Sequence, residues 1–334
     1  MVYEMKWNSL TDKKTRLDTF RPLPDALVRN LEDWFRVELT YTSNALEGNT
    51  LTRRETAMVV EKGITVGGKL LKEHLEATNH AEALDWVAGQ VSRKPGSLNE
   101  QDFLHLHNLL LKGIDDDNAG HYRSVPVRIA GSPVVMPNPR KVPDRMESFA
   151  TWLQEESGLH PVELAAEAHY QLVTIHPFVD GNGRTARLLM NLILMMEGYP
   201  PAIIRRRDRL AYIRSLEEAQ LGGSKEDFLQ IIGKAAGRSL DIYLKAAQGE
   251  DAGMDPEPRL LKIGELGKRV GENNSTIRHW TKEGLLEVAE FTESGYQLYD
   301  PEMVGSIRKI QEWKKDRLTL SEIREKLSES ISGN

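Results

Sequence analysis

HPFVDGNGRTAR, residues 176–187, carries the most distinctive chemistry in the sequence and lies between two segments of helical periodicity. Gly181 and Gly183 allow the backbone to approach a ligand closely, and the helix expected after them offers free N–H groups and its positive dipole end. Arg184 and Arg187 are three positions apart, so their guanidinium groups share one helix face and can bind successive phosphates. The stretch therefore predicts a phosphate-binding loop that joins two helices.

Two further side chains of this stretch favour catalysis. Asp180 offers a hard oxygen ligand, and Mg²⁺ in nucleotide sites is usually held by a carboxylate together with substrate phosphates. His176 titrates near neutral pH and could accept a proton from an attacking hydroxyl. A lone histidine or a lone Gly-x-Gly turn is more often structural. A base, a carboxylate, a glycine loop and two arginines within twelve positions favour an active site.

The sequence around this stretch is predominantly helical. Apolar spacing predicts helices over residues 25–46, 52–61, 71–91, 99–111, 143–156, 162–175, 184–196, 207–221 and 225–247. Between residues 120 and 143 the pattern changes to β-branched residues on either side of the turn Ala130-Gly131-Ser132, which predicts a short hairpin over 125–136. The expected fold class is mostly α with one small hairpin in this part of the chain.

A composition change separates a smaller C-terminal part. Residues 248–258, QGEDAGMDPEP, are acidic and rich in Gly and Pro, which is typical of a linker. Beyond it the pattern predicts helices over 263–270, 275–283, 301–314 and 321–328, and two short β-like runs at 288–291 and 296–299. We therefore expect two domains.

The composition excludes several classes of protein. The 334 residues include no cysteine, so a disulfide framework, a thiolate zinc site and a Cys nucleophile are ruled out. A net charge of −6 gives no global attraction to nucleic acid or to anionic lipid. Residues 1–20 are polar, with no apolar stretch for a signal peptide or a membrane span, so we expect a cytoplasmic protein without a membrane partner. His105 and His107 lie on nearly opposite helix faces, and no zinc site is assigned.

Residues 176–187 resemble the Fic-domain signature H-P-F-x-[D/E]-G-N-G-R-x-x-R at every specified position, and the similarity extends over about residues 40–244. The resemblance implies a mostly helical Fic fold that transfers the AMP moiety of ATP to a side-chain hydroxyl of a target protein, which could be the chain itself. It also implies an N-terminal helical region over 1–97, with an inhibitory helix at about 25–47, and a catalytic core over 98–247.

The same resemblance assigns roles to individual residues. His176 would be the general base toward the target hydroxyl, and Asp180 would be the Mg²⁺ ligand. Arg184 would hold the β-phosphate, and Arg187 the γ-phosphate. The cradle around the α- and β-phosphates would consist of Gly181, Asn182 and Gly183. A transferred group other than AMP, such as UMP or phosphocholine, is a less favoured alternative, because the cradle binds phosphates without defining the base.

The predicted hairpin resembles the flap of Fic proteins, which would hold an extended target segment by strand addition. The flap residues expected to dock the target are Val127, Ile129, Gly131 and Val134. An ordinary surface hairpin is the alternative interpretation.

Residues 42–49, TSNALEGN, carry the second distinctive pattern. Ser43 and Glu47 share a helix face near a C-terminus, where the negative dipole end disfavours a carboxylate that has no cation nearby. The pattern resembles the Fic inhibitory motif [S/T]-x-x-x-E-[G/N], matched by Ser43, Glu47 and Gly48. The resemblance implies that Glu47 pairs with Arg187 and withholds it from the γ-phosphate. In some Fic proteins the same glutamate is thought to orient water for removing AMP, so de-AMPylation stays open.

Residues 259–334 resemble the MerR-type winged helix-turn-helix, whose second helix, here 275–283, enters the DNA major groove. From residue 256 onward there are 13 Lys and Arg against 14 Asp and Glu, and the wing over 292–297 lacks arginine, which disfavours DNA binding. The cations available for DNA are Lys268, Arg269, Arg278 and Lys282. Reuse of the winged helix for protein contacts is the alternative.

A DNA-binding transcriptional regulator, in which the Fic part senses ATP or modifies its own chain, is therefore the second hypothesis for the function. The pattern of this sequence does not lead us to expect the long dimerisation helix of MerR proteins, so we expect a homodimer to form through the Fic part.

Overall fold

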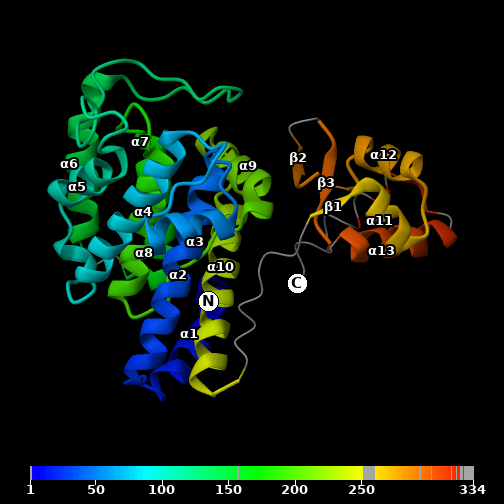
Figure 1. Cartoon of the computed structure of the whole chain (residues 1–334), viewed down its shortest axis with the longest axis horizontal. Coiled ribbons are helices and arrows are strands. Elements are labelled where there is room, and N and C mark those ends of the chain that lie inside the picture. Colours follow the sequence, from blue (N-terminus) through cyan, green and yellow to red (C-terminus); the bar gives the residue numbers. More distant parts are fainter. Residues whose placement is uncertain are drawn as a thin grey trace. The chain divides into compact units, whose positions relative to one another are not determined.

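Helices dominate the computed structural model of the chain, which confirms the predicted mostly α class (Figure 1). The structure describes residues 2–155, 158–250 and 260–326, apart from 287, 293–294, 302, 317, 321 and 324–325. These residues form two compact units, one within Met1–Arg206 and Ala211–Met254 and the other within Arg207–Leu210 and Asp255–Asn334. Most of the expected linker and of the helix expected at 321–328 lies outside the described residues.

The predicted helices of the larger part are present, with ends shifted by at most two residues. They are α2 (Asp25–Leu46), α3 (Arg53–Lys62), α4 (Leu71–Gly89), α5 (Glu100–Leu111), α6 (Val142–Gln154), α7 (Pro161–Ile175), α8 (Asn182–Met196), α9 (Arg209–Gln220) and α10 (Glu226–Ala247). Single 3-10 turns lie at Pro95–Ser97, Pro139–Lys141 and Arg206–Asp208. None of the described helices is long and apolar enough to cross a membrane.

Helix α8 lies at the centre of the first unit and packs against α7 along its length. Every residue from Arg184 to Leu194 is buried, so α8 has no solvent face. Helices α4 and α5 cover another side of α8, and the C-terminal end of α2, at Ser43, contacts it as well. The loop between α7 and α8 is therefore held on a rigid scaffold.

An N-terminal helix, α1 (Val2–Asp18), was not predicted. It packs against α10 and buries Trp7, Leu10 and Leu17 in the main core. These three apolar residues are separated by polar and charged side chains, so their spacing gave too weak a helical pattern to be recognised.

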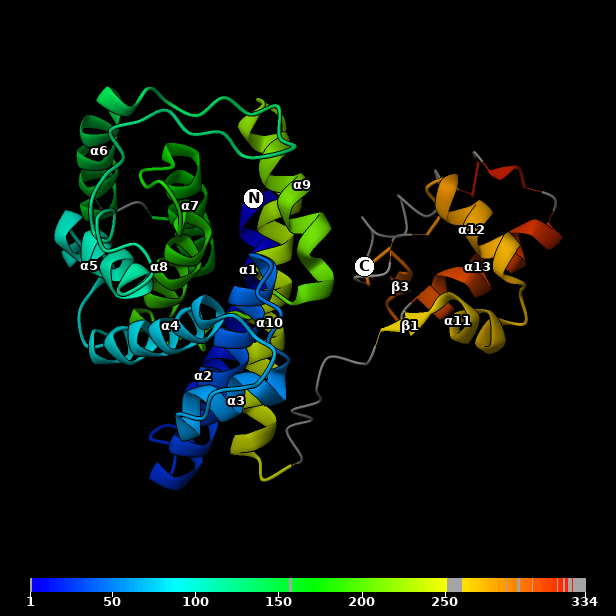
Figure 2. The same cartoon turned by 45° about the horizontal axis from the view of Figure 1, so that its top comes forward.

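The hairpin prediction over 125–136 was wrong in detail. Residues 124–137, called the flap segment below, form two extended legs around a turn, and Figure 2 shows the legs reaching across the unit to α9. The turn is closed by a hydrogen bond from Ser132 N–H to Ile129 O of 3.2 Å, but no strand is present in this segment. The prolines at 126, 133 and 137 lack N–H groups and cannot donate to a ladder between the legs.

The second unit is a small helical domain with a three-stranded antiparallel sheet, as a winged helix requires. Its elements are β1 (Leu261–Lys262), α11 (Ile263–Val270), α12 (Asn274–Lys282), β2 (Glu290–Phe291), β3 (Gln297–Tyr299) and α13 (Met303–Lys315). The strand order is β1-β3-β2, with Leu261 opposite Tyr299 and Glu290 opposite Leu298. Strand β1 was not predicted. The unit has a core of its own around Leu266, Ile277, Trp280 and Tyr299.

Candidate functional site

The loop between α7 and α8 has a tightly determined backbone. His176 ends α7 in the left-handed conformation, with φ 51°, and is the one non-glycine residue with positive φ among those described. Gly181 precedes α8 with φ 77°, and a Cβ there would lie 2.9 Å from Leu111 Cδ2. Because both the φ angle and the available space exclude other residues, glycine is required at position 181.

Asn182 and His107 hold this loop in shape. The Asn182 side chain accepts a hydrogen bond from Phe178 N–H and donates one to Phe178 O, both of 2.9 Å. Its amide is therefore occupied within the loop, and of Asn182 only the backbone is available to a cradle. His107 accepts from Gly120 N–H and donates from Nε2 to Asp180 O, both at 3.0 Å, while its ring stacks on Phe178. Burial lowers the pKa of His107 to about 4, so the ring is neutral at pH 7.

The ring of His176 is oriented for general-base chemistry. Its Nδ1 lies 3.3 Å from Val173 O, and a carbonyl oxygen only accepts hydrogen bonds, so Nδ1 carries the proton and Nε2 keeps its lone pair. Burial lowers the pKa of His176 and so does the Arg123 guanidinium, whereas the Val173 carbonyl, Glu47 and Asp180 act to raise it. The net shift is downward, so the imidazole is neutral at pH 7 and can accept a proton.

Asp180 and Arg184 form an ion pair at the start of α8, with Asp180 partly exposed and Arg184 buried. Asp180 Oδ2 lies 3.3 Å from Arg184 Nη2, and its Oδ1 accepts from Gly181 N–H at 2.6 Å. Burial acts to raise the pKa of Asp180, but Arg184 and the Gly181 N–H outweigh it and hold the pKa below its ordinary value. Arg184 is itself buried and is held on its other side by Glu76 Oε1 of α4 at 3.2 Å.

The carboxylate of Asp180 suits a magnesium ion. Its side chain is 52% exposed and ionised, which leaves room for water and phosphate ligands. No cluster of three or more His, Asp or Glu residues that could hold a metal alone occurs in the described part of the chain. One carboxylate with substrate phosphates is the arrangement that Mg²⁺ adopts in nucleotide sites, so the residues present fit this ion.

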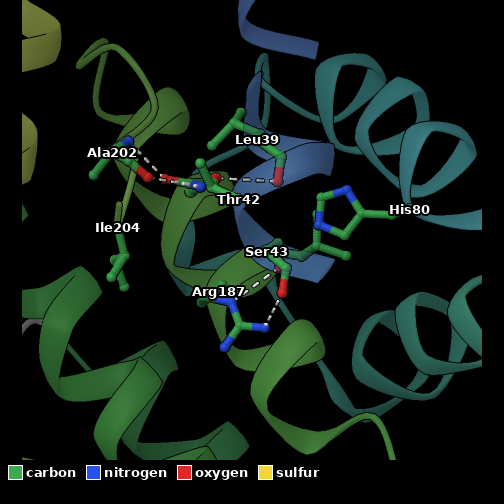
Figure 3. Close-up of a pocket in the computed structure, with 9 residues that line it drawn as sticks. Leu39, Thr42, Ser43, His80, Arg187, Ala202 and Ile204 are labelled. Carbon is green, nitrogen blue, oxygen red and sulfur yellow. Dashed lines mark hydrogen bonds between the residues drawn. The ribbon is translucent and has the colours of Figure 1, made fainter. Parts of the chain in front are cut away.

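The structure places Arg187 against the end of α2. Its Nη2 donates to Glu47 Oε1 at 2.7 Å and to Ser43 O at 3.0 Å, and its Nε donates to Ser43 Oγ at 3.0 Å. Burial acts to lower the pKa of Arg187, but Glu47 outweighs it, and the pKa is raised. Figure 3 shows the guanidinium turned toward Ser43. Glu47 follows the last residue of α2, and Gly48, with φ 97°, turns the chain away.

Glu47 also lies over the N-terminus of α8. A Cβ built on Gly183 would collide with Glu47 Oε1, so this close approach depends on glycine. The carboxylate therefore takes the position at which a helix N-terminus would receive an anion.

A buried polar layer lies behind Arg187. Tyr212 OH is 3.5 Å from Arg187 Nη1 and 2.8 Å from His169 Nε2, while His80 Nδ1 is 3.2 Å from Thr40 Oγ1. Burial, together with the nearby charge of Arg187, lowers the pKa of both His80 and His169 to about 3. The small pocket drawn in Figure 3, lined in part by Ser43, His80 and Arg187, has room for little more than a water molecule.

The four expected docking residues lie on the two legs and at the turn of the flap segment. Ile129 and Gly131 are exposed, and Val127 and Val134 are half-buried. The turn is fixed to α9 by a hydrogen bond of 2.7 Å from Ser132 Oγ to Glu217 Oε1. The outer face of the turn is thus open to a partner, while its inner face is attached to the unit.

Sequence reasoning missed several residues that build the site, namely Glu76, His107, Arg123, His169 and Tyr212. Each is a polar side chain whose partner lies far away in the chain, and Tyr212 and His169, for instance, are 43 positions apart. The one available signal was a polar residue within an apolar helical pattern, as at His107.

The fold and the loop define a class: a helical protein in which a histidine, a carboxylate and two arginines converge on the N-terminus of a buried helix. Residues 97–194 match the family model described as Fic/DOC family, and residues 261–330 match that described as MerR HTH family regulatory protein. A Fic domain containing signaling protein from Bacteroides thetaiotaomicron is 32% identical, with a TM-score of 0.67 over 73% of this chain and 98% of that chain. Fic-1 from C. elegans is also 32% identical, with a TM-score of 0.67 over 74% of each chain. The chain belongs to the Fic family.

Curated relatives include proteins named protein adenylyltransferase Fic. The one from Nematostella vectensis is 42% identical over 206 residues, which are 61% of this chain and 48% of the relative. That from Drosophila persimilis is 34% identical over 297 residues, which are 88% of this chain and 57% of the relative. The chain thus spans about half the length of the curated relatives it matches.

Proposed function

We propose that the chain is a protein adenylyltransferase that transfers AMP from ATP to a side-chain hydroxyl of a target protein. The observation that carries this proposal is the neutral His176, with Nε2 free, next to a helix N-terminus that bears two arginines. Membership of the Fic family and the names of the curated relatives support it.

Different residues of the site would carry out proton transfer and stabilisation of the phosphate charge. His176 Nε2 accepts the proton of the target hydroxyl while that oxygen forms a bond to the α-phosphorus of ATP. The bond from the α-phosphorus to the bridging oxygen breaks, and pyrophosphate leaves with the electron pair. The amides of Gly181, Asn182 and Gly183 and the guanidinium groups of Arg184 and Arg187 stabilise the phosphate charge. A magnesium ion held by Asp180 would neutralise part of that charge.

We propose that the described geometry is an inhibited state. Arg187 cannot serve the Glu47 carboxylate and a γ-phosphate equally well, and Glu47 at the start of α8 repels the phosphate chain. Release of Glu47 would then be required for a productive ATP geometry. The same carboxylate would also be near enough to the loop to orient a water molecule, so removal of AMP is compatible with this proposal.

A mass measurement tests the transferase. Wild type, Glu47→Gly and Glu47→Gly/His176→Ala are each incubated with Mg²⁺ and ATP, alone and with cell lysate, and analysed by intact mass and peptide mapping. We expect an AMP adduct with Glu47→Gly and none with the double variant, because the base is missing there. Failure of every variant to transfer AMP would contradict the proposal.

The second unit supports an additional proposal, that the chain binds DNA. One observation is the match of this unit to the MerR family model, and the other is a set of four exposed cations on two helices. The cations are Lys268 and Arg269 on α11 and Arg278 and Lys282 on α12. Residues 293–294 of the expected wing lie outside the described residues.

If the second unit binds DNA, a mixed duplex pool should shift in a gel at low salt. The logarithm of the binding constant should fall linearly with the logarithm of the salt concentration, with a slope of about −0.9 for each phosphate contacted. Arg278→Ala/Lys282→Ala should weaken binding, whereas Lys245→Ala on α10 should not. An unshifted duplex pool at low salt would instead leave protein contacts as the role of this unit.

A further inference from the structure

Arg123 is a buried arginine that connects three segments of the first unit. Only 3% of the surface of Arg123 is exposed. Nε donates to His176 O at 2.7 Å, Nη2 donates to Pro137 O at 2.7 Å, and Nη1 donates to Val125 O at 3.2 Å. Val125 and Pro137 belong to opposite legs of the flap segment, and His176 is the candidate base. One guanidinium therefore holds both legs of the flap segment and the catalytic loop.

The main chain of Arg123 adds a fourth connection. Its N–H donates to Pro177 O at 2.9 Å, so two consecutive carbonyls of the catalytic loop are bound by the same residue. His176 has the left-handed backbone, and a bond to its carbonyl fixes the peptide plane that follows it. The legs cannot form a ladder with each other because of their prolines, so the guanidinium supplies hydrogen bonds that a hairpin would otherwise supply.

Arg123 has an unusual environment for a buried cation. Its side-chain partners are carbonyl oxygens, and the described residues offer it no carboxylate within ion-pair distance. Burial accordingly lowers the pKa of Arg123. A planar fork of donors can bind three carbonyls from different directions, which the single ammonium group of lysine cannot do equally well. The arrangement is costly for a purely structural purpose, because buried charges are normally paired.

We propose that Arg123 is a positioning residue that couples the flap segment to the catalytic histidine, so that a target held by the flap segment is presented at a fixed distance from His176 Nε2. This inference rests on the proposed function for its chemical meaning, while the mechanical coupling stands on the described contacts alone. Within the described residues, the hydrogen bonds of Arg123 to the loop stop at residue 177 and include none of the residues proposed to bind ATP. Its loss should therefore leave ATP binding intact and impair transfer.

The charge of Arg123 gives a second readout. The charged groups that act on His176 are Arg123, which lowers its pKa, and Glu47 and Asp180, which raise it. In a Glu47→Gly background, Arg123→Gln removes the lowering charge, so the acid limb of the transfer rate should move to higher pH. Arg123→Lys keeps a positive charge and should leave that limb near its original position.

The coupling is tested by amide hydrogen exchange, which needs no activity. We expect Arg123→Gln to raise exchange both in residues 124–137 and in residues 178–181, with Arg123→Lys intermediate. Arg93→Gln is the matched control, because Arg93 also binds backbone and side-chain acceptors, at Ser97 and Asp102, but neither the flap segment nor the loop. Arg93→Gln should leave amide exchange unchanged in both segments. Exchange raised in the flap segment alone, or in neither segment, would overturn the coupling.

Activity is then measured as self-adenylylation, in the Glu47→Gly background with ATP and Mg²⁺. We expect Arg123→Gln to slow transfer by about 10- to 100-fold, since a misplacement of about 1 Å can cost that much, with an unchanged Kd for ATP. A weakened Kd for ATP would overturn the assignment, because it would place the effect on the phosphate site. If the Glu47→Gly parent transfers AMP neither to itself nor to proteins of a cell lysate, while Arg123→Gln still raises exchange in both segments, the transferase proposal fails and the coupling stands.

Discussion

Replacing Glu47 with Gly is expected to raise the rate of AMP transfer by about 100-fold. The Glu47–Arg187 bond is a charge-assisted hydrogen bond of 2.7 Å with a buried partner, and such bonds contribute about 1.5–3 kcal/mol, or about 10- to 150-fold. The carboxylate also lies against Gly183 at the start of α8, where it opposes an incoming phosphate. Its removal both frees the guanidinium and clears the anion position.

Two milder variants separate these contributions. Glu47→Gln keeps the shape and an acceptor oxygen for Arg187 but removes the charge, so it should give a smaller gain than Glu47→Gly. Ser43→Ala removes the hydrogen bond that Arg187 Nε donates to Ser43 Oγ. The bonds that Arg187 donates to Ser43 O and to Glu47 remain, so the gain should be the smallest of the three. Initial rates of AMP incorporation at saturating ATP rank the three variants.

A double variant shows whether the gain acts through the arginine. Glu47→Gly/Arg187→Ala should return to a low rate, because the benefit of removing Glu47 depends on a free guanidinium at position 187. Equal rates for wild type and Glu47→Gly, with ATP bound by both proteins, would disprove the brake. A double variant as fast as Glu47→Gly would show that Glu47 acts on the phosphates and not through Arg187.

The order of helices could be predicted from the sequence because it depends on local periodicity. Helix α2, for example, ends at Leu46, two residues before Gly48, whose positive φ favours glycine. The site residues between 176 and 187 could be identified from the sequence because they form one continuous motif. Glu47 could be identified because its motif is also short and continuous. The resemblance already implied that Glu47 pairs with Arg187, 140 positions away, whereas the close approach of Glu47 to Gly183 is seen only in the structure.

The rest could not be predicted because it depends on contacts between distant segments. Arg123 binds a carbonyl 53 positions away, and nothing near it in the sequence marks that partner. The flap segment was predicted as a ladder because its β-branched residues fit strands, but its prolines remove the donors. In that segment propensity and hydrogen bonding disagree, and hydrogen bonding decides the structure.

The first unit is expected to lose stability steeply between about pH 6.5 and pH 5. Three buried histidines have depressed pKa values, about 3 for His80 and His169 and about 4 for His107. In the unfolded chain each returns to an ordinary pKa of about 6.5. Below that pH the unfolded state binds protons that the folded state cannot, so the free energy of unfolding falls as the pH falls. The stabilisation is fully present above about pH 6.5.

The size of the effect follows from linkage. Well below pH 6.5, each neutral histidine contributes a slope of about 1.4 kcal/mol per pH unit, and the three together about 4 kcal/mol per pH unit. Most carboxylates still carry their charge at pH 5, so they add little in this window. Since whole domains are stable by only about 5–15 kcal/mol, the fall from about pH 6.5 to about pH 5 should remove much of the stability of the first unit.

Hydrogen exchange of the slowest amides of α8 isolates this effect in the first unit, after correction for the pH dependence of intrinsic exchange. His80→Gln and His169→Gln each remove one titrating group, so each should flatten the dependence by about 1.4 kcal/mol per pH unit, whatever its effect at pH 7.5. The comparison of slopes is therefore independent of how well glutamine packs. If both variants keep the wild-type slope, the folded protein must accommodate imidazolium at these positions, and the buried layer behind Arg187 must admit water.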